Sequence, residues 1–187
     1  MLDLIKNELR EGEKLLWTGA PEEFETLDLT TKTPFIRKAV IILTVVLATC
    51  IWYVTYCMNN GVELKPALVV VLVICALIGS FNFYFQAKKL RRTTYAITDQ
   101  RLISIIDLPK SVEFSAIKEI QLKSDADGHV SVLCGSQTIN AKAHQWRSLA
   151  LTDPYIDQET GLCDRFILYA IPDAENVKKI LGDFLPL

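Results

Sequence analysis

The side chains best suited to catalysis are few and lie far apart in the sequence. The chain has two histidines, His129 and His144, and five cysteines that include no CxxC pair. A nucleophilic pair of Cys163 with His144 would require the segment 142–164 to fold back on itself, and nothing in the spacing demands that. An odd cysteine count without paired spacings favours neither a disulfide framework nor a zinc site. We therefore expect no catalytic residue, no metal ligand and no cofactor, and predict that the protein is not an enzyme.

The stretch SDADGH, residues 124–129, resembles the beginning of a calcium-binding loop. Such a loop needs an acidic ligand at its twelfth position, and counting from Asp125 that position is Ser136. Asp-Gly is also the strongest short signal for a hairpin turn. The stretch is therefore predicted to be a turn between two strands.

Four basic residues follow an apolar run: Lys88, Lys89, Arg91 and Arg92. They have two interpretations, which the sequence leaves open. One is a topological stop signal. The other is contact with anionic lipid headgroups, which contributes about 1 kcal/mol per residue near a membrane surface.

The elements that would position these side chains begin with two apolar runs. Residues 39–58 and 67–85 carry no charged side chain. As helices, runs of this length are about 30 Å long, the thickness of a hydrocarbon core. The connection 59–66 is short, so the two helices must be antiparallel. We predict a transmembrane helical hairpin over residues 39–86.

The charged flanks of the hairpin predict its orientation. Arg37 and Lys38 precede the first run and the four basic residues follow the second, whereas the connection holds only Lys65. The positive-inside rule then places both termini in the cytoplasm. The predicted location is the cell (inner) membrane, crossed twice. Trp52 and Tyr84 are predicted anchors at its two interfaces, and Trp17 is a predicted anchor in the N-terminal cytoplasmic segment 1–38.

The rest of the chain reads as short strands followed by one helix. We predict about seven antiparallel strands and expect them in a curved sheet or partly open barrel: residues 93–98, 101–107, 111–114, 117–123, 129–133, 137–141 and 165–171. Near the C-terminus Asp173 is a predicted N-cap. An apolar stripe then predicts a helix that caps the sheet, with Val177, Ile180, Leu181 and Phe184 buried. The fold class is therefore α+β.

The chain resembles the membrane-anchored bacterial pleckstrin-homology (PH) family. Three features carry the resemblance: GEKLLWTGAPE at residues 12–22, the two-span hairpin, and RRTTYAITDQRLISI at residues 91–105. It implies a PH-like domain over residues 91–187. The hairpin motif is predicted to be structural, through Tyr95, Thr98, Asp99 and Arg101.

Charge narrows the expected partners of this domain. Residues 93–187 hold nine Lys or Arg and thirteen Asp or Glu, and Arg101 is the only basic residue at the turn 99–100. Nucleic acids and phosphoinositides both need clustered cations, so neither is an expected ligand. We predict a membrane-tethered binding or scaffold module whose partners are the lipid bilayer and either an unknown protein or further copies of itself. The alternative is a lipid-responsive or accessory subunit of a larger membrane transport complex.

Overall fold

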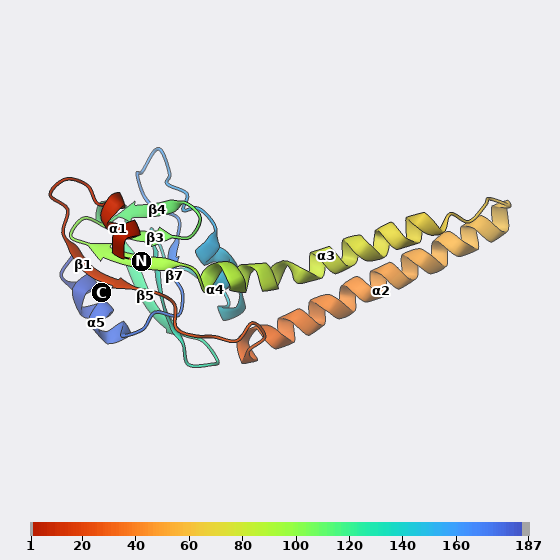
Figure 1. Cartoon of the computed structure of the whole chain (residues 1–187), viewed down its shortest axis with the longest axis horizontal. Coiled ribbons are helices and arrows are strands. Elements are labelled where there is room, and N and C mark those ends of the chain that lie inside the picture. The colour runs from red at the N-terminus through yellow and green to blue at the C-terminus, as the bar shows by residue number, and fades with distance from the viewer. Residues whose placement is uncertain (1, 185–187) are drawn as a thin grey trace.

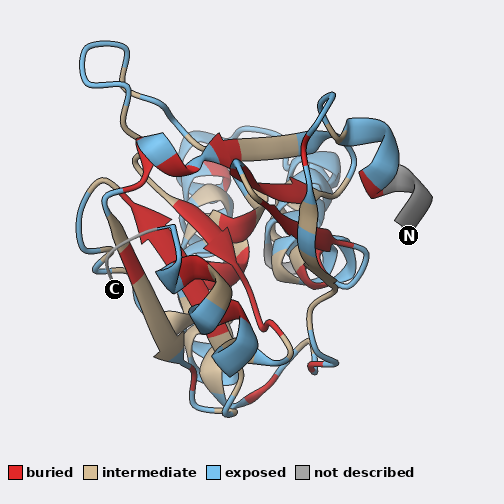
Figure 2. Cartoon of the chain, turned by 90° about the vertical axis from the view of Figure 1, so that its left-hand side faces the viewer, coloured by how far each residue is buried: buried red, intermediate tan, exposed pale blue. Residues whose placement is uncertain are grey.

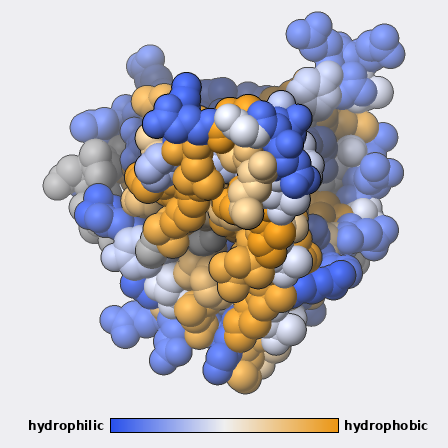
Figure 3. Space-filling view, turned by 90° about the vertical axis from the view of Figure 1, so that its right-hand side faces the viewer, coloured by the Kyte–Doolittle hydropathy of each residue, from blue (hydrophilic) through white to orange (hydrophobic). Residues whose placement is uncertain are grey.

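The computed structural model describes residues 2–184 as a sheet domain from which two long helices project on one side (Figure 1). Helix α2 spans Leu29–Asn60 and helix α3 spans Pro66–Leu90. Both are long and apolar enough to cross a membrane. Viewed from the tip of this hairpin, the two helices present an almost continuous apolar surface (Figure 3).

Local sequence accounts for the ends of the two helices. Gly61 ends α2 in the left-handed conformation, with φ 62°, and Pro66 begins α3, where its missing N–H costs nothing. Helix α2 begins at Leu29, well before the predicted start at residue 39. Pro34 lies inside this helix, within its first two turns. The early start follows from capping by Asp28, described below.

The strands form two antiparallel sheets that do not close into a barrel, in place of the predicted curved sheet or partly open barrel. One sheet has the order β1-β2-β3-β4 and the other has the order β5-β6-β7. Their bounds are β1 (Leu15–Gly19), β2 (Thr94–Thr98), β3 (Arg101–Ile105), β4 (Pro109–Glu113), β5 (Glu119–Ser124), β6 (Val130–Gly135) and β7 (Phe166–Leu168). The coarse α+β layout is confirmed.

The N-terminal segment belongs to the sheet domain. Strand β1 pairs with β2, with Thr18 opposite Ala96. Helix α1 (Leu2–Glu8) buries Ile5 against Ala96 and Ile103. Residues 137–141, predicted as a strand, are not a strand in the structure. Their place in the strand count is taken by β1.

The main core lies between the sheets and helix α5 (Ala174–Gly182). Figure 2 shows buried residues gathered there. Val177 and Leu181 are fully buried, as predicted. Phe184 is 38% exposed because it follows the end of α5, although its ring stacks on Phe114 with centroids 4.9 Å apart. Asp173 holds the predicted N-cap position of α5, but with φ 55° its side chain makes no capping hydrogen bond.

A second core cluster joins the sheet domain to the helices. It is built around helix α4 (Ala143–Leu151), which lies within the segment 142–164 for which we predicted no structure. Trp146 and Ala150 of α4 pack with Leu90 of α3 and Tyr169 beside β7. A single 3₁₀ turn, η1 (Phe114–Ala116), links β4 to β5. The segment between the sixth and seventh strands therefore provides the contact with the helical hairpin.

Candidate functional site

Two carboxylates from different parts of the chain cap the start of α2. Asp28 accepts a hydrogen bond from the backbone N–H of Thr31 at 2.9 Å. Asp127, in the turn between β5 and β6, accepts from the N–H groups of Leu29 at 3.1 Å and Thr30 at 3.0 Å. Acidic caps satisfy the free N–H groups of a helix start and complement its dipole. The β5–β6 turn thus holds the first helix in place.

Arg147 of α4 joins this cap to the core. Its guanidinium donates to the carboxylate of Asp28, to the Tyr169 hydroxyl at 3.0 Å and to the carbonyl of Thr26 at 3.1 Å. It also lies over the Phe24 ring, 4.4 Å from the centroid. Arg147 and Asp28 have side chains only 5% and 4% exposed. A buried pair of this kind is stable only when its remaining polar atoms are bonded, as they are here.

Asp125 and His129 extend the polar network below Tyr169. One Asp125 oxygen accepts from the backbone N–H of Asp127 and of His129, and the other lies 3.4 Å from both the Tyr169 hydroxyl and the His129 Nδ1. Burial raises the pKa of Tyr169 to about 12, so this hydroxyl stays protonated and serves as a donor. The two backbone hydrogen bonds to Asp125 close the turn that was predicted at residues 124–129, which the structure confirms.

Side chains that could hold a metal do converge in this network, although the sequence predicted no such set. Ligand atoms of Asp28, Asp125 and His129 lie within 4.8 Å of one another. The guanidinium of Arg147 already contacts Asp28 there, so a cation lies beside this carboxylate without a metal. We therefore interpret the group as part of the hydrogen-bonded network around Arg147 and Tyr169.

Arg91, at the end of α3, binds the same connecting segment. Its guanidinium donates to the carbonyl of Phe24 at 2.8 Å and to the hydroxyl of Thr26 at 3.0 Å. Arg147 also contacts Phe24 and Thr26. The two helices are consequently fixed to one short segment of the domain. We call the set Phe24, Thr26, Asp28, Arg91, Asp127, Arg147 and Tyr169 the junction.

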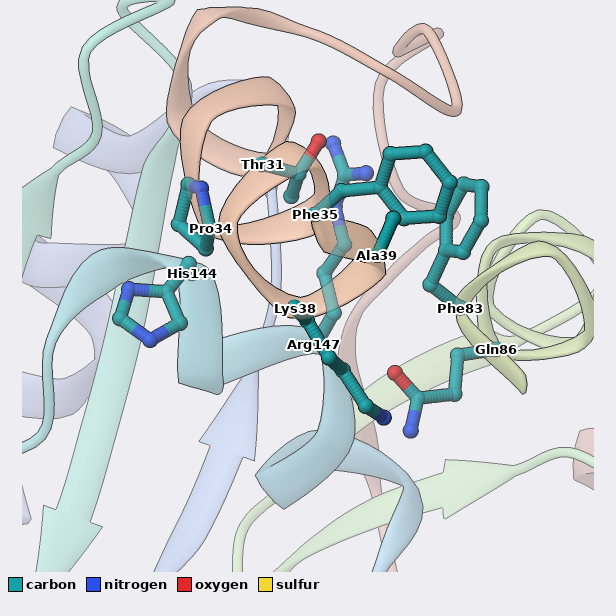
Figure 4. Close-up of a pocket in the computed structure, with 9 residues that line it drawn as sticks. All are labelled: Thr31, Pro34, Phe35, Lys38, Ala39, Phe83, Gln86, His144 and Arg147. Atoms are coloured by element: carbon teal, nitrogen blue, oxygen red, sulfur yellow. The ribbon is translucent and has the colours of Figure 1, made fainter. Parts of the chain in front are cut away.

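A pocket of about 140 Å³ opens beside the junction, between α2, α3 and α4 (Figure 4). It combines an apolar wall with polar side chains, and its lining is Thr31, Pro34, Phe35, Lys38, Ala39, Phe83, Gln86, His144 and Arg147. The rings of Phe35 and Phe83 pack against one another at an interplanar angle of 50°, with centroids 4.3 Å apart. In the close-up, the ends of Lys38 and Gln86 point toward one another across its opening (Figure 4). We call this space the junction pocket.

The predicted basic cluster is divided by the structure. Arg91 faces the junction, whereas Lys88, Lys89 and Arg92 line another hollow together with Phe85, Ile106 and Asp107. Lys89 there pairs with Asp107 at 2.7 Å, with both groups exposed. Beside it Leu108, in the β3–β4 turn, is 74% exposed. Contact of these residues with lipid headgroups stays a prediction.

The motif residues of the β2–β3 hairpin form hydrogen bonds and an ion pair that join the two sequence motifs. Arg101 forms a bidentate ion pair with Glu13, with N–O distances of 2.8 and 2.9 Å. Thr98 donates to the same Glu13 carboxylate at 2.7 Å, and Asp99 accepts from the N–H of Lys14. The stretches 12–22 and 91–105 are thus in direct contact.

Tyr95 and the three predicted anchors have distinct environments. The Tyr95 hydroxyl is buried and accepts from the N–H of Tyr169 at 3.1 Å. Trp17 lies in β1, packed against the main core and over Gly19, where a Cβ would lie 2.6 Å from its ring. That position favours a structural role for Trp17. Trp52 and Tyr84 are 67% and 49% exposed, toward opposite ends of the hairpin.

His144 and Cys163 are not brought together. His144 lines the junction pocket, while Cys163 is buried in the main core. Burial raises the pKa of the Cys163 thiol to about 11, which opposes a nucleophilic role.

Comparison of the chain with family models, with curated proteins and with solved structures finds no match.

Proposed function

We propose that the protein is a non-enzymatic, membrane-anchored binding module. The two helices cross the inner membrane, both termini lie in the cytoplasm, and the PH-like sheet domain is held at the membrane surface. There it binds a protein partner or a second copy of the chain.

The observation that carries this proposal is the junction. A tether whose only task is to keep a domain near a membrane can be a flexible linker. In this chain, the start of α2 and the end of α3 are fixed to the domain by hydrogen bonds from Asp127 and Arg91 and by the buried ion pair of Arg147 with Asp28. Such contacts give the domain one orientation relative to the helices, which suits a module that presents a particular face.

The face we assign to partner binding is the loop 152–164, which protrudes from the domain (Figure 2). Tyr155 and Ile156 are 64% and 45% exposed on the first arm of the loop, where Ile156 pairs with Cys163. Asp157 organises the loop by accepting from the N–H of Glu159 and the hydroxyl of Thr160. Exposed apolar side chains within an acidic, ordered loop favour a partner that offers an apolar pocket with a basic rim.

Photo-crosslinking in native membranes tests this assignment. A photoreactive side chain at Tyr155 of the full chain should give one discrete adduct, either with a partner or with a second copy. The same group at Lys178, an exposed position on α5, is the matched control and should give none. Double substitution of Asp153 and Asp157 by asparagine should reduce the Tyr155 adduct if the partner is basic. Equal crosslinking at both positions, or none at Tyr155, would contradict the proposal.

One observation favours the lipid-responsive part of the alternative function. The junction pocket lies where the helices meet the domain, and it is lined by both apolar and polar side chains. A ligand there would contact the helices and the domain at once. The chemistry of that ligand is argued next.

A further inference from the structure

We propose that the junction pocket binds the phosphate of one phospholipid, with an acyl chain of the same lipid lying between α2 and α3. This inference rests on the membrane anchoring proposed above. It goes beyond it by naming a ligand, a site and the residues that would hold it.

The first support is the continuity of two cavities. The junction pocket shares Phe35, Ala39 and Phe83 with a second, almost wholly apolar groove of about 450 Å³. The remaining lining of that groove comes from facing sides of the two helices: Ile42, Leu43, Val46, Val73, Ala76 and Leu77. One end of the combined space is therefore polar and the other is apolar. A phospholipid has this same division.

The second support is depth. Lys38 is the last charged residue before the apolar run of α2, and Gln86 lies between the apolar run of α3 and Lys88. Both side chains thus lie at the level where hydrocarbon gives way to headgroups, if the helices span the bilayer. The groove, which begins at Ala39, lies at the depth of acyl chains.

The third support is charge. Lys38 is exposed and forms no ion pair with any residue that the structure describes, so its ammonium is free to bind an anion. The charge of Arg147 is already matched by Asp28, and His144 contributes an imidazole at the pocket wall. The site therefore offers one uncompensated cation, Lys38, in a lining that also contains the amide of Gln86 and the imidazole of His144. That matches a phosphodiester with a single negative charge and not a multiply phosphorylated headgroup.

Lipid binding can be measured on the full chain by native mass spectrometry. The detergent-purified protein is stripped of lipid and titrated with phosphatidylglycerol or with phosphatidylcholine. Both carry the phosphodiester, but only the first has a net charge. We expect one saturable lipid per chain, with phosphatidylglycerol preferred. Lys38→Ala should weaken phosphatidylglycerol binding roughly tenfold, the usual effect of losing one charge-assisted hydrogen bond.

Matched variants separate this site from general attraction to lipid. Arg37→Ala removes the same charge from the adjacent residue, which does not line the pocket, and should change affinity less than about twofold. Ala39→Phe should block the passage to the groove and weaken both lipids. Val40→Phe, on the exposed side of α2, should weaken neither. Equal effects of Lys38→Ala and Arg37→Ala, binding without saturation, or chain dimers in place of lipid adducts would overturn the proposal.

Failure of the lipid site can be distinguished from failure of the anchoring. Each variant is first tested for retention in membranes washed at alkaline pH. Loss of the wild-type chain in that wash would contradict the membrane-anchored function itself. Retention without a saturable lipid adduct would overturn the lipid site alone.

Discussion

Replacement of Arg147 by alanine should lower the free energy of unfolding of the full chain by about 3–5 kcal/mol, because it leaves Asp28 buried without its partner. The same change removes the hydrogen bond to Tyr169 and the cation above the Phe24 ring. Both effects weaken the contact between α4 and the helical hairpin. Denaturant unfolding in detergent micelles, followed by circular dichroism, measures the change.

Two further variants identify the cause of that loss. Arg165→Ala removes a pair with Asp164 in which the side chains are 43% and 32% exposed, and it should cost less than about 1 kcal/mol. Asp28→Asn keeps a good N-cap, so adding it to Arg147→Ala should restore part of the stability by removing the unpaired charge. If Arg147→Ala and Arg165→Ala cost the same, the junction does not hold the domain as described.

Replacement of Arg101 by alanine should have an effect of similar size, about 3–5 kcal/mol, by isolating the buried Glu13 carboxylate. The side chains of Arg101 and Glu13 are 11% and 0% exposed. The matched control is Arg10→Ala, whose partner Glu113 is half exposed, with an expected cost below about 1 kcal/mol. The same unfolding measurement compares the two, and equal costs would contradict a structural role for the hairpin motif.

The Glu13 pair also predicts how stability depends on pH. Hydrogen bonds from Arg101 lower the pKa of Glu13 from 4.5 to about 2 in the folded chain, against the opposing effect of burial. A group whose pKa is lowered on folding stabilises the fold above its unfolded pKa. That stabilisation is lost as the pH falls from about 4.5 toward 2. Glu13→Gln should therefore flatten the stability profile in this window, and an unchanged acid dependence would show that other carboxylates dominate it.

The hairpin was predictable because its signals are local. Uncharged runs, the turn residues around Gly61 and the proline at residue 66 determine two helices without reference to the rest of the chain. The start of α2 was missed because the turn that caps it, at Asp127, is far away in sequence. A local signal was also present, since Asp28 and Thr31 form a reciprocal cap.

Strand assignments failed where pairing partners are distant. Strand β1 is short, and only its pairing with β2, with Thr18 opposite Ala96, makes it part of a sheet. Residues 137–141 were predicted as a strand, but the structure places a non-strand connection to α4 there. Phe184 continued the stripe of α5 in sequence, although the helix ends at Gly182.

The candidate site could not be read from the sequence at all. Its lining comes from three helices that are separated along the chain, and Arg147 had no signal that distinguished it from a solvated residue. The predicted basic residues Lys88, Lys89, Arg91 and Arg92 lie near the end of α3, and their contact with lipid headgroups stays a prediction. Their division between the junction and the hollow beside Asp107 depends on side-chain direction, which composition does not reveal.

The most direct test of membrane anchoring with a cytoplasmic domain is labelling of single added cysteines by a thiol reagent that does not cross membranes. Val62→Cys lies in the connection between the helices, and Lys178→Cys lies on α5 in the sheet domain. In intact cells we expect labelling at residue 62 and not at residue 178, and labelling at both once the membranes are opened. The wild-type chain, with its own five cysteines, gives the background. Labelling of residue 178 in intact cells would contradict the cytoplasmic placement of the domain on which the proposed function depends.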